Sequence, residues 1–178
     1  MKNPGENIVQ SNHPVLRAKA KNVPLKDITS SKIANILYQM KEAMYTQKDG
    51  VAIAAPQIGE SLSIFIVSDK ILKEADPEYK SNGKDLIFIN PVITKLSRDK
   101  HDVEEGCLSV RWKYGKVRRS IKASIKAYNE NGEVIERGAS GLLAQVFQHE
   151  VDHLNGILFI DTATDVQDIP PEELEQSK

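Results

Sequence analysis

The stretch Gln148-His149-Glu150-Val151-Asp152-His153 places two histidines four residues apart, with a glutamate directly after the first. On an α-helix this spacing puts both imidazoles on one face, where they can share a metal ion. Glu150 then lies beside the metal rather than on it. This is the His-Glu-x-x-His arrangement of metal-dependent hydrolases, in which the glutamate transfers protons for an activated water. The stretch therefore predicts a metal-bearing helix around which the fold is organised.

Apolar residues at helical spacing surround this stretch and predict that its helix is buried. One face suits packing against sheets and consists of Leu143, Phe147, Val151 and Leu154. A neighbouring face combines the metal ligands with a partly apolar wall, and consists of Leu142, Gln145, Val146, His149 and His153. Gly156 is a natural end for the helix.

Short apolar runs bounded by turn-forming residues predict strands elsewhere in the chain. These runs cover residues 64–67, 86–89, 92–96 and 157–160. The second and third are separated by Asn90-Pro91, which predicts a bend between them.

Two further patterns complete the expected fold. Apolar residues alternate with polar ones over residues 121–127 and return at 134–135 across a turn at 129–132, which predicts a β-hairpin. Residues 29–45 carry helical periodicity behind Thr29-Ser30-Ser31, and the charged residues 70–84 read as a surface excursion. The sequence thus predicts an α+β single domain, with short, mainly antiparallel sheets packed around a central C-terminal helix.

Composition excludes several classes of protein. With 178 residues, 40% hydrophobic and 28% charged residues and a net charge of −1, the chain reads as a soluble monomer without direct nucleic-acid or membrane binding. The single cysteine forms no internal disulfide, and the polar start of the chain lacks a signal-peptide pattern, so a cytoplasmic location is expected. Residues 165–178 are acidic and polar around Pro170-Pro171 and predict a mobile tail.

Cys107, within Glu105-Gly106-Cys107-Leu108-Ser109, is the candidate third ligand. A lone cysteine is more often a small buried apolar residue, but these flanking residues favour a loop that presents a side chain at a fixed angle. A closed structural site would need a fourth ligand such as His13 or His101, and neither has ligand-like spacing. Three protein ligands and a water are the catalytic pattern. The donor set suits Fe²⁺, Zn²⁺, Ni²⁺ or Co²⁺ without choosing among them.

The stretch Gly50-Val51-Ala52-Ile53-Ala54-Ala55-Pro56-Gln57-Ile58-Gly59 is unusually rich in small residues. Such a density indicates that something approaches the backbone closely, either a ligand or a tightly packed turn. No Gly-Lys-Ser/Thr follows, which argues against a phosphate-binding loop.

Together these three motifs resemble the peptide deformylase family. The small-residue loop ending in Gln57, the Glu-Gly-Cys-Leu-Ser motif at 105–109 and the Gln-His-Glu-x-x-His motif at 148–153 occur here in the family's order. Residues 13–17 also resemble the family's opening segment, and the resemblance covers about residues 9–161. Ordinary His-Glu-x-x-His proteases take their third ligand downstream, whereas Cys107 lies upstream.

The resemblance implies a deformylase-like catalytic domain over residues 1–164. Cys107, His149 and His153 would hold one divalent metal, Fe²⁺ in the cell, with Zn²⁺, Ni²⁺ or Co²⁺ possible in purified protein. The enzyme would hydrolyse the formyl group from the N-terminal formyl-methionine of nascent peptides and release formate. Glu150 would transfer the proton, and the oxyanion would be bound by the Gln57 side-chain amide and the Leu108 backbone N–H.

The resemblance also implies a substrate site. The peptide would bind in an extended form along the backbone, and the methionine side chain would enter a pocket. The residues implied are Gly50, Val51, Ala52, Glu105, Gly106, Leu142, Gln145 and Val146.

Four features depart from the family's pattern. Ala52 stands where a second glycine is usual, and would be strained if that position needs positive φ. Gln145 stands where an apolar residue is usual, Arg111 stands where a proline is usual, and the tail is short and acidic, which leaves ribosome docking open. Ala52 and Gln145 motivate one alternative, an atypical deformylase-like protein with an altered substrate pocket. A second alternative is a non-catalytic protein in which the metal only stabilises the fold.

Overall fold

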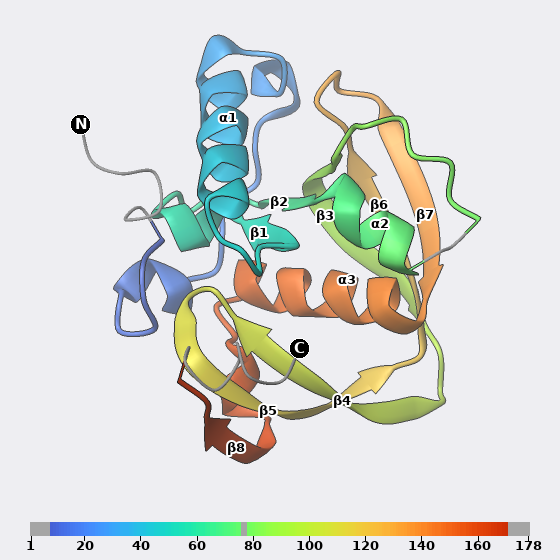
Figure 1. Cartoon of the computed structure of the whole chain (residues 1–178). Helices are drawn as coiled ribbons and strands as arrows, with labels where there is room; N and C mark the ends of the chain where they lie inside the picture. Colours follow the sequence, from blue (N-terminus) through green and yellow to red (C-terminus); the bar gives the residue numbers. More distant parts are fainter. Residues whose placement is uncertain (1–7, 76–77, 171–178) are drawn as a thin grey trace.

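The computed structural model describes residues 8–75 and 78–170 (Figure 1). The described chain contains three α-helices and eight strands. In order they are α1 (Ser31–Tyr45), β1 (Ala52–Ala54), β2 (Ile64–Val67), α2 (Asp69–Ala75), β3 (Leu86–Leu96), β4 (Lys100–Cys107), β5 (Val110–Ser120), β6 (Lys122–Tyr128), β7 (Val134–Ser140), α3 (Gly141–Leu154) and β8 (Thr164–Asp168). Short 3-10 turns connect them at Pro14–Arg17, Leu25–Asp27, Ala55–Ile58 and Phe159–Asp161.

The strands form two antiparallel sheets. The larger has the order β1-β2-β3-β6-β7, and the smaller has the order β4-β5-β8. Figure 1 shows α3 lying between them, with β1 on one side and β4 and β5 on the other. The α+β class and the central C-terminal helix are therefore confirmed.

β2 is buried on both faces because helices cover both sides of its sheet. Phe65 packs toward α3, where its ring stacks on Phe88 at 4.6 Å and Phe88 meets Phe147 edge-on at 5.1 Å. The alternate residues Ile64 and Ile66 pack with the apolar face of α1 in a second cluster. An uninterrupted apolar strand is what burial on both faces requires.

Several predicted elements are confirmed. The first helix begins at Ser31, after Ser30, whose hydroxyl accepts a hydrogen bond of 3.3 Å from the Ile33 N–H. The predicted hairpin is β6–β7, joined by a turn with Gly132 at φ 78°. The bend at Asn90 is also present: this residue has φ 52°, and its carboxamide makes two 2.8 Å hydrogen bonds to the backbone of Val23.

The expected surface excursion over residues 70–84 is wrong in its first part. Asp69–Ala75 forms α2, and its side chains Ile71 and Leu72 join the core around Phe65. Two adjacent apolar residues within a charged segment are too few to display helical periodicity, so the segment's polar composition misled the prediction.

The predicted strand over residues 157–160 is also wrong. Phe159–Asp161 is a 3-10 turn, stabilised by the Leu158 N–H, which donates to the Asp161 carboxylate at 2.9 Å. The chain then forms β8, Thr164–Asp168, so ordered structure continues past the predicted boundary at residue 164. The remainder of the predicted tail, residues 171–178, lies outside the described residues.

The β4–β5 hairpin is the main element that was not predicted, and it carries Cys107. Cys107 is the last residue of β4 and pairs with Val110, so Leu108 and Ser109 form the tip between the strands. The cysteine is therefore presented from a tight hairpin rather than from an open loop. No helix among the described residues is both long and apolar enough to cross a membrane.

Candidate metal centre and active site

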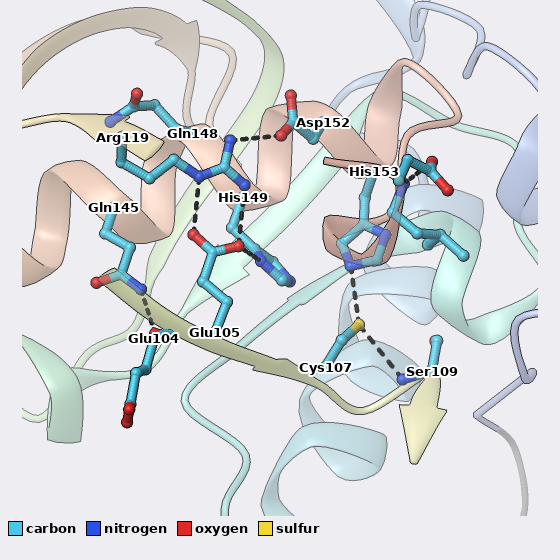
Figure 2. A network of polar contacts seen from close by, with 12 residues as sticks. Glu104, Glu105, Cys107, Ser109, Arg119, Gln145, Gln148, His149, Asp152 and His153 are labelled. Atoms are coloured by element: carbon cyan, nitrogen blue, oxygen red, sulfur yellow. Dashed lines mark hydrogen bonds and ion pairs between the residues drawn. The ribbon is translucent and has the colours of Figure 1, made fainter. Parts of the chain in front are cut away.

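Cys107, His149 and His153 converge from two elements. The hairpin tip supplies the thiol, and consecutive turns of α3 supply the two imidazoles (Figure 2). Their candidate ligand atoms all lie within 4.8 Å of one another, and the cysteine Sγ is 3.2 Å from His153 Nε2. One sulfur and two imidazole nitrogens at this spacing fit a divalent transition metal.

The site does not have a closed four-ligand set among the described residues. The cluster consists of these three side chains alone. His13 instead accepts a 3.2 Å hydrogen bond from the Val15 N–H at its own turn, and His101 lies on β4 opposite Arg119. The geometry thus favours the open catalytic pattern over a closed structural one.

A buried ion-pair network orients His149. Its Nδ1 lies 2.9 Å from Glu105 Oε2, which leaves Nε2 available for a metal. Arg119 holds the same carboxylate with two hydrogen bonds of 2.7 and 3.0 Å (Figure 2). Burial raises the pKa of Glu105, but His149 and Arg119 lower it more, to about 2, so this group is a carboxylate at neutral pH. A charged acceptor fixes the tautomer and ring orientation of a ligating histidine.

Arg119 also joins this network to α3. Its second terminal nitrogen donates to Asp152 Oδ2 at 2.6 Å, so Asp152 is a salt-bridging carboxylate. Gln148 adds a further anchor, because its carboxamide accepts from the Ser120 N–H at 3.0 Å and donates to the Ser120 carbonyl at 2.9 Å. These contacts fix α3 against the end of β5.

The thiol of Cys107 lies in an environment that favours the thiolate. Burial raises its pKa, but His153 and His149 lower it more, to about 5. The Ser109 N–H also points at the sulfur, at 3.4 Å. A thiolate is the form that ligates metals.

Glu150 lies between the two histidines in sequence and is buried beside them. Burial raises its pKa to about 6 despite the neighbouring imidazoles. Its Oε2 has no hydrogen-bond partner among the described atoms, and neither does Nδ1 of His153. A buried carboxylate that lines the pocket and has an unpartnered oxygen is available to exchange a proton with a ligand.

Gln57 approaches the cysteine from the other side. Its carbonyl oxygen accepts from the Ala54 N–H at 2.8 Å, which turns the amide nitrogen toward Ser109 Oγ at 3.3 Å and Cys107 Sγ at 3.6 Å. The predicted proximity of this amide to the metal ligands is therefore present in the structure.

A pocket of about 250 Å³ opens beside these groups. Most of the predicted substrate residues line it, namely Val51, Ala52, Glu105, Gly106, Leu142, Gln145 and Val146, and so does Leu108, the predicted oxyanion donor. Gly50 does not. A Cβ at this position would clash with the Met44 carbonyl oxygen at the end of α1. Close packing therefore explains why a glycine is needed here.

Three residues that depart from the family's pattern line this pocket, namely Ala52, Gln145 and Arg111. Ala52 is a residue of β1 and is not among those with positive φ, so the expected backbone strain is absent. Its side chain joins the core around Phe65. Gln145 donates its amide to the Glu104 carbonyl at 2.8 Å, which fixes a polar side chain in the pocket wall (Figure 2).

Sequence reasoning missed Arg119, Ser109 and the pocket residues Asp49 and Trp112, and it named Arg111 only as a departure from the family's pattern. For Arg119 a signal existed: it follows Val117 at the period of two that a strand's buried face requires, and both are buried. For the others the signal was absent, because their contacts depend on the unpredicted β4–β5 hairpin.

Comparisons with known proteins agree with this geometry. The family model described as polypeptide deformylase matches residues 6–168. A peptide deformylase of Halothermothrix orenii is 45% identical over 149 residues, which cover 83% of this chain and 86% of that protein. A peptide deformylase of Pseudothermotoga lettingae is 43% identical over 148 residues, covering 83% of this chain and 77% of that protein.

Solved structures show the same likeness. A peptide deformylase of Synechococcus elongatus in complex with actinonin superposes with a TM-score of 0.78 at 31% identity, covering 95% of this chain and 83% of that one. A class I type b peptide deformylase of Acinetobacter baumannii, bound to Met-Ala-Ser, gives a TM-score of 0.75 at 32% identity, covering 86% of this chain and 96% of that one.

Proposed function

The chain belongs to the polypeptide deformylase family, and on that premise we propose how its side chains remove the formyl group from the N-terminal methionine of a nascent peptide. The reaction is the hydrolysis of an amide: water adds to the formyl carbon, the carbon–nitrogen bond breaks, and formate and a free amine leave. The observation that carries the assignment is the convergence of Cys107, His149 and His153 beside the buried carboxylate of Glu150.

Cys107, His149 and His153 are the proposed metal ligands, and Fe²⁺ is the proposed metal in the cell. When bound, a divalent cation with an open position activates a water near neutral pH and polarises the carbonyl that it faces. Support comes from the donor chemistry, because a thiolate and two imidazoles within 4.8 Å suit Fe²⁺, Zn²⁺, Ni²⁺ and Co²⁺ alike. Glu105 and Arg119 then act through His149, whose ring they orient.

Glu150 is the proposed general base and acid. It takes the proton of the attacking water and returns it to the nitrogen of the leaving amine. Its burial and its unpartnered Oε2 support this role, because a carboxyl group with a pKa near 6 exchanges protons efficiently near neutral pH.

Gln57 and the backbone N–H of Leu108 are the proposed oxyanion donors. The Gln57 amide nitrogen is already directed at the metal ligands, because Ala54 holds its carbonyl oxygen on the opposite side. A donor that is fixed before the reaction stabilises the developing charge without reorganising.

The peptide is proposed to lie between β1 and β4. Each is an edge strand of its own sheet, and both line the pocket. An extended peptide can form backbone hydrogen bonds with such edges. Val51, Ala52, Glu105 and Gly106 would then contact its backbone, whereas Leu142, Gln145 and Val146 on α3 would contact the methionine side chain.

The test is formate release from formyl-Met-Ala-Ser by protein loaded with Fe²⁺, Ni²⁺ or Co²⁺, with metal analysis of the same sample. We expect turnover with one metal per chain. Turnover only on formyl peptides with another first residue would instead indicate an altered pocket. Bound metal without turnover on any formyl peptide would refute the proposal. Since nascent chains are made in the cytoplasm and the only cysteine serves the metal, we place the reaction there.

A further inference from the structure

Arg111 spans the rim of the substrate pocket. It lies near the start of β5, and its two terminal nitrogens donate to Asp49 Oδ2 at 2.7 Å and to Gln47 Oε1 at 2.6 Å. Both acceptors belong to the segment that joins α1 to β1. Arg111 and Asp49 line the pocket, so one guanidinium connects its two walls.

On its pocket side, the wall that Arg111 holds is not paired with another strand among the described residues. β1 contains three residues and pairs only with β2, so its second edge faces the pocket. Gln57, just after β1, contacts Cys107 and Ser109 at the inner end of the pocket. The chain therefore contacts the β4–β5 hairpin both before β1, through Asp49, and after it, through Gln57.

The guanidinium is itself held in place. It lies over the Trp112 ring, with 4.8 Å between its central carbon and the ring centroid. The Arg111 side chain is 19% exposed, whereas that of Asp49 is 51% exposed. A planar group that is stacked on one face and hydrogen-bonded at two edges loses little freedom on forming these contacts.

We propose that Arg111 is a positioning residue for substrate binding: through Asp49 and Gln47 it holds β1 at the distance from β4 that an extended peptide requires. The inference rests on the proposed function, and it concerns a position where the resemblance led us to expect a proline. Arg111 acts on the strand that binds the peptide, not on the reacting atoms.

The consequence follows from the cost of ordering a binding site. Without Arg111 the segment over residues 47–51 must be fixed when the peptide arrives, and that cost is subtracted from the binding free energy. Binding of substrate and product should weaken together, whereas the metal ligands and Glu150 are untouched. KM therefore rises and kcat stays the same.

The test compares Arg111→Ala with Arg118→Ala in metal-loaded protein. Arg118 lies on the same strand and pairs with Asp102 at 3.1 Å, but that pair connects β5 with β4 and does not cross the pocket. We expect Arg111→Ala to raise both the Kd of Met-Ala-Ser by calorimetry and the KM of formyl-Met-Ala-Ser about fivefold, with kcat and metal content unchanged. Arg118→Ala should change none of these.

Two further variants separate positioning from a general loss of stability. Arg111→Lys keeps one donor and should give an intermediate KM, and the charge reversal Asp49→Arg with Arg111→Asp should restore part of the loss. Hydrogen–deuterium exchange over residues 46–54 should be faster in Arg111→Ala than in Arg118→Ala, whether or not any peptide is turned over.

Three results would overturn the inference: an unchanged KM and Kd in Arg111→Ala, a loss confined to kcat, or an effect that depends on the charge of the second peptide residue. The last would mean that Arg111 contacts the substrate directly. Failure of the wild-type protein to release formate would refute the proposed function separately, because the exchange measurement needs no turnover.

Discussion

His149 Nδ1 and Glu105 Oε2 lie 2.9 Å apart, and this contact decides which nitrogen of the imidazole is left for a metal. The carboxylate is almost fully buried and is held in turn by Arg119 through two hydrogen bonds. A ligating ring that is fixed in this way gives up no rotational freedom when the metal binds. Metal affinity should therefore depend on Glu105 although it is not a ligand.

The first prediction is that Glu105→Gln weakens metal binding about 10- to 100-fold, because a neutral amide holds the imidazole less well than a carboxylate. Competition with a chelator measures the affinity. Glu104→Gln is the matched control, since Glu104 is the exposed neighbour on the same strand. Equal affinities in the two variants would show that the network does not tune the metal.

The second prediction concerns acid stability of the metal-free protein. The pKa of Glu105 is lowered from 4.5 to about 2, so the folded protein binds this proton less tightly than the unfolded chain does. The carboxylate therefore stabilises the fold above pH 4.5, and this contribution is lost as the pH falls from 4.5 toward 2.

Urea unfolding of the wild type and of Glu105→Gln measures this contribution. Between about pH 6 and about pH 3, the difference between their unfolding free energies should shrink by about 2 kcal/mol. A difference that is independent of pH would mean that the ion pair does not lower the pKa of Glu105.

The third prediction is that Glu150→Ala keeps its metal and loses activity by about 10²- to 10⁴-fold, because proton transfer to the leaving nitrogen is removed while the three ligands remain. Formate release and metal analysis on the same sample separate these effects. Turnover at the wild-type rate would refute the role of Glu150, whereas simultaneous loss of metal would indicate a structural role instead.

The helices and strands that could be predicted are those in which burial of one face makes apolar residues recur at a regular spacing in the sequence. α3 shows its apolar stripe because it is covered on two sides by sheets, and β6 alternates because only one of its faces is buried. The run 157–160 shows the limit of this reasoning. Four apolar residues fit a strand or a turn equally, and here the Asp161 carboxylate, by accepting from the Leu158 N–H, selects the turn.

The candidate metal ligands could be proposed from local spacing, whereas the residues that orient them could not, because those contacts join two distant segments. The four-residue spacing of His149 and His153 alone indicates a shared metal site. Val117 and Arg119 alternate as a buried strand face does, but no local signal shows that Arg119 meets Glu105, because that contact forms only when β4 pairs with β5. Arg111 likewise has no local signal, because its partners lie before β1.

The fourth prediction is that Ala52→Gly destabilises the protein by about 1 kcal/mol. Ala52 has ordinary strand geometry and its methyl group is part of the core, so glycine would lose buried apolar area and add freedom to the unfolded chain. Thermal or urea unfolding measures the change. A gain in stability would mean that the Ala52 side chain does strain the backbone at this position.

The fifth prediction is that Gln145→Leu lowers the KM for formyl-Met-Ala-Ser. Gln145 brings an amide between the apolar pocket residues Leu142 and Val146, and methionine offers this amide no strong hydrogen-bond partner. Leucine has a similar volume and no polar atoms, and the Glu104 carbonyl that it would leave unpaired belongs to an exposed residue.

We expect KM to fall about two- to fivefold with kcat unchanged, as extra apolar contact of the methionine side chain would produce. Gln145→Glu is the matched control: it keeps the length of the side chain, replaces the amide donor with a charge and should raise KM. An increase in KM for the leucine variant would mean that Gln145 favours substrate binding, because its hydrogen bond to β4 holds the pocket wall in place. That gain would then exceed the loss caused by its polar amide.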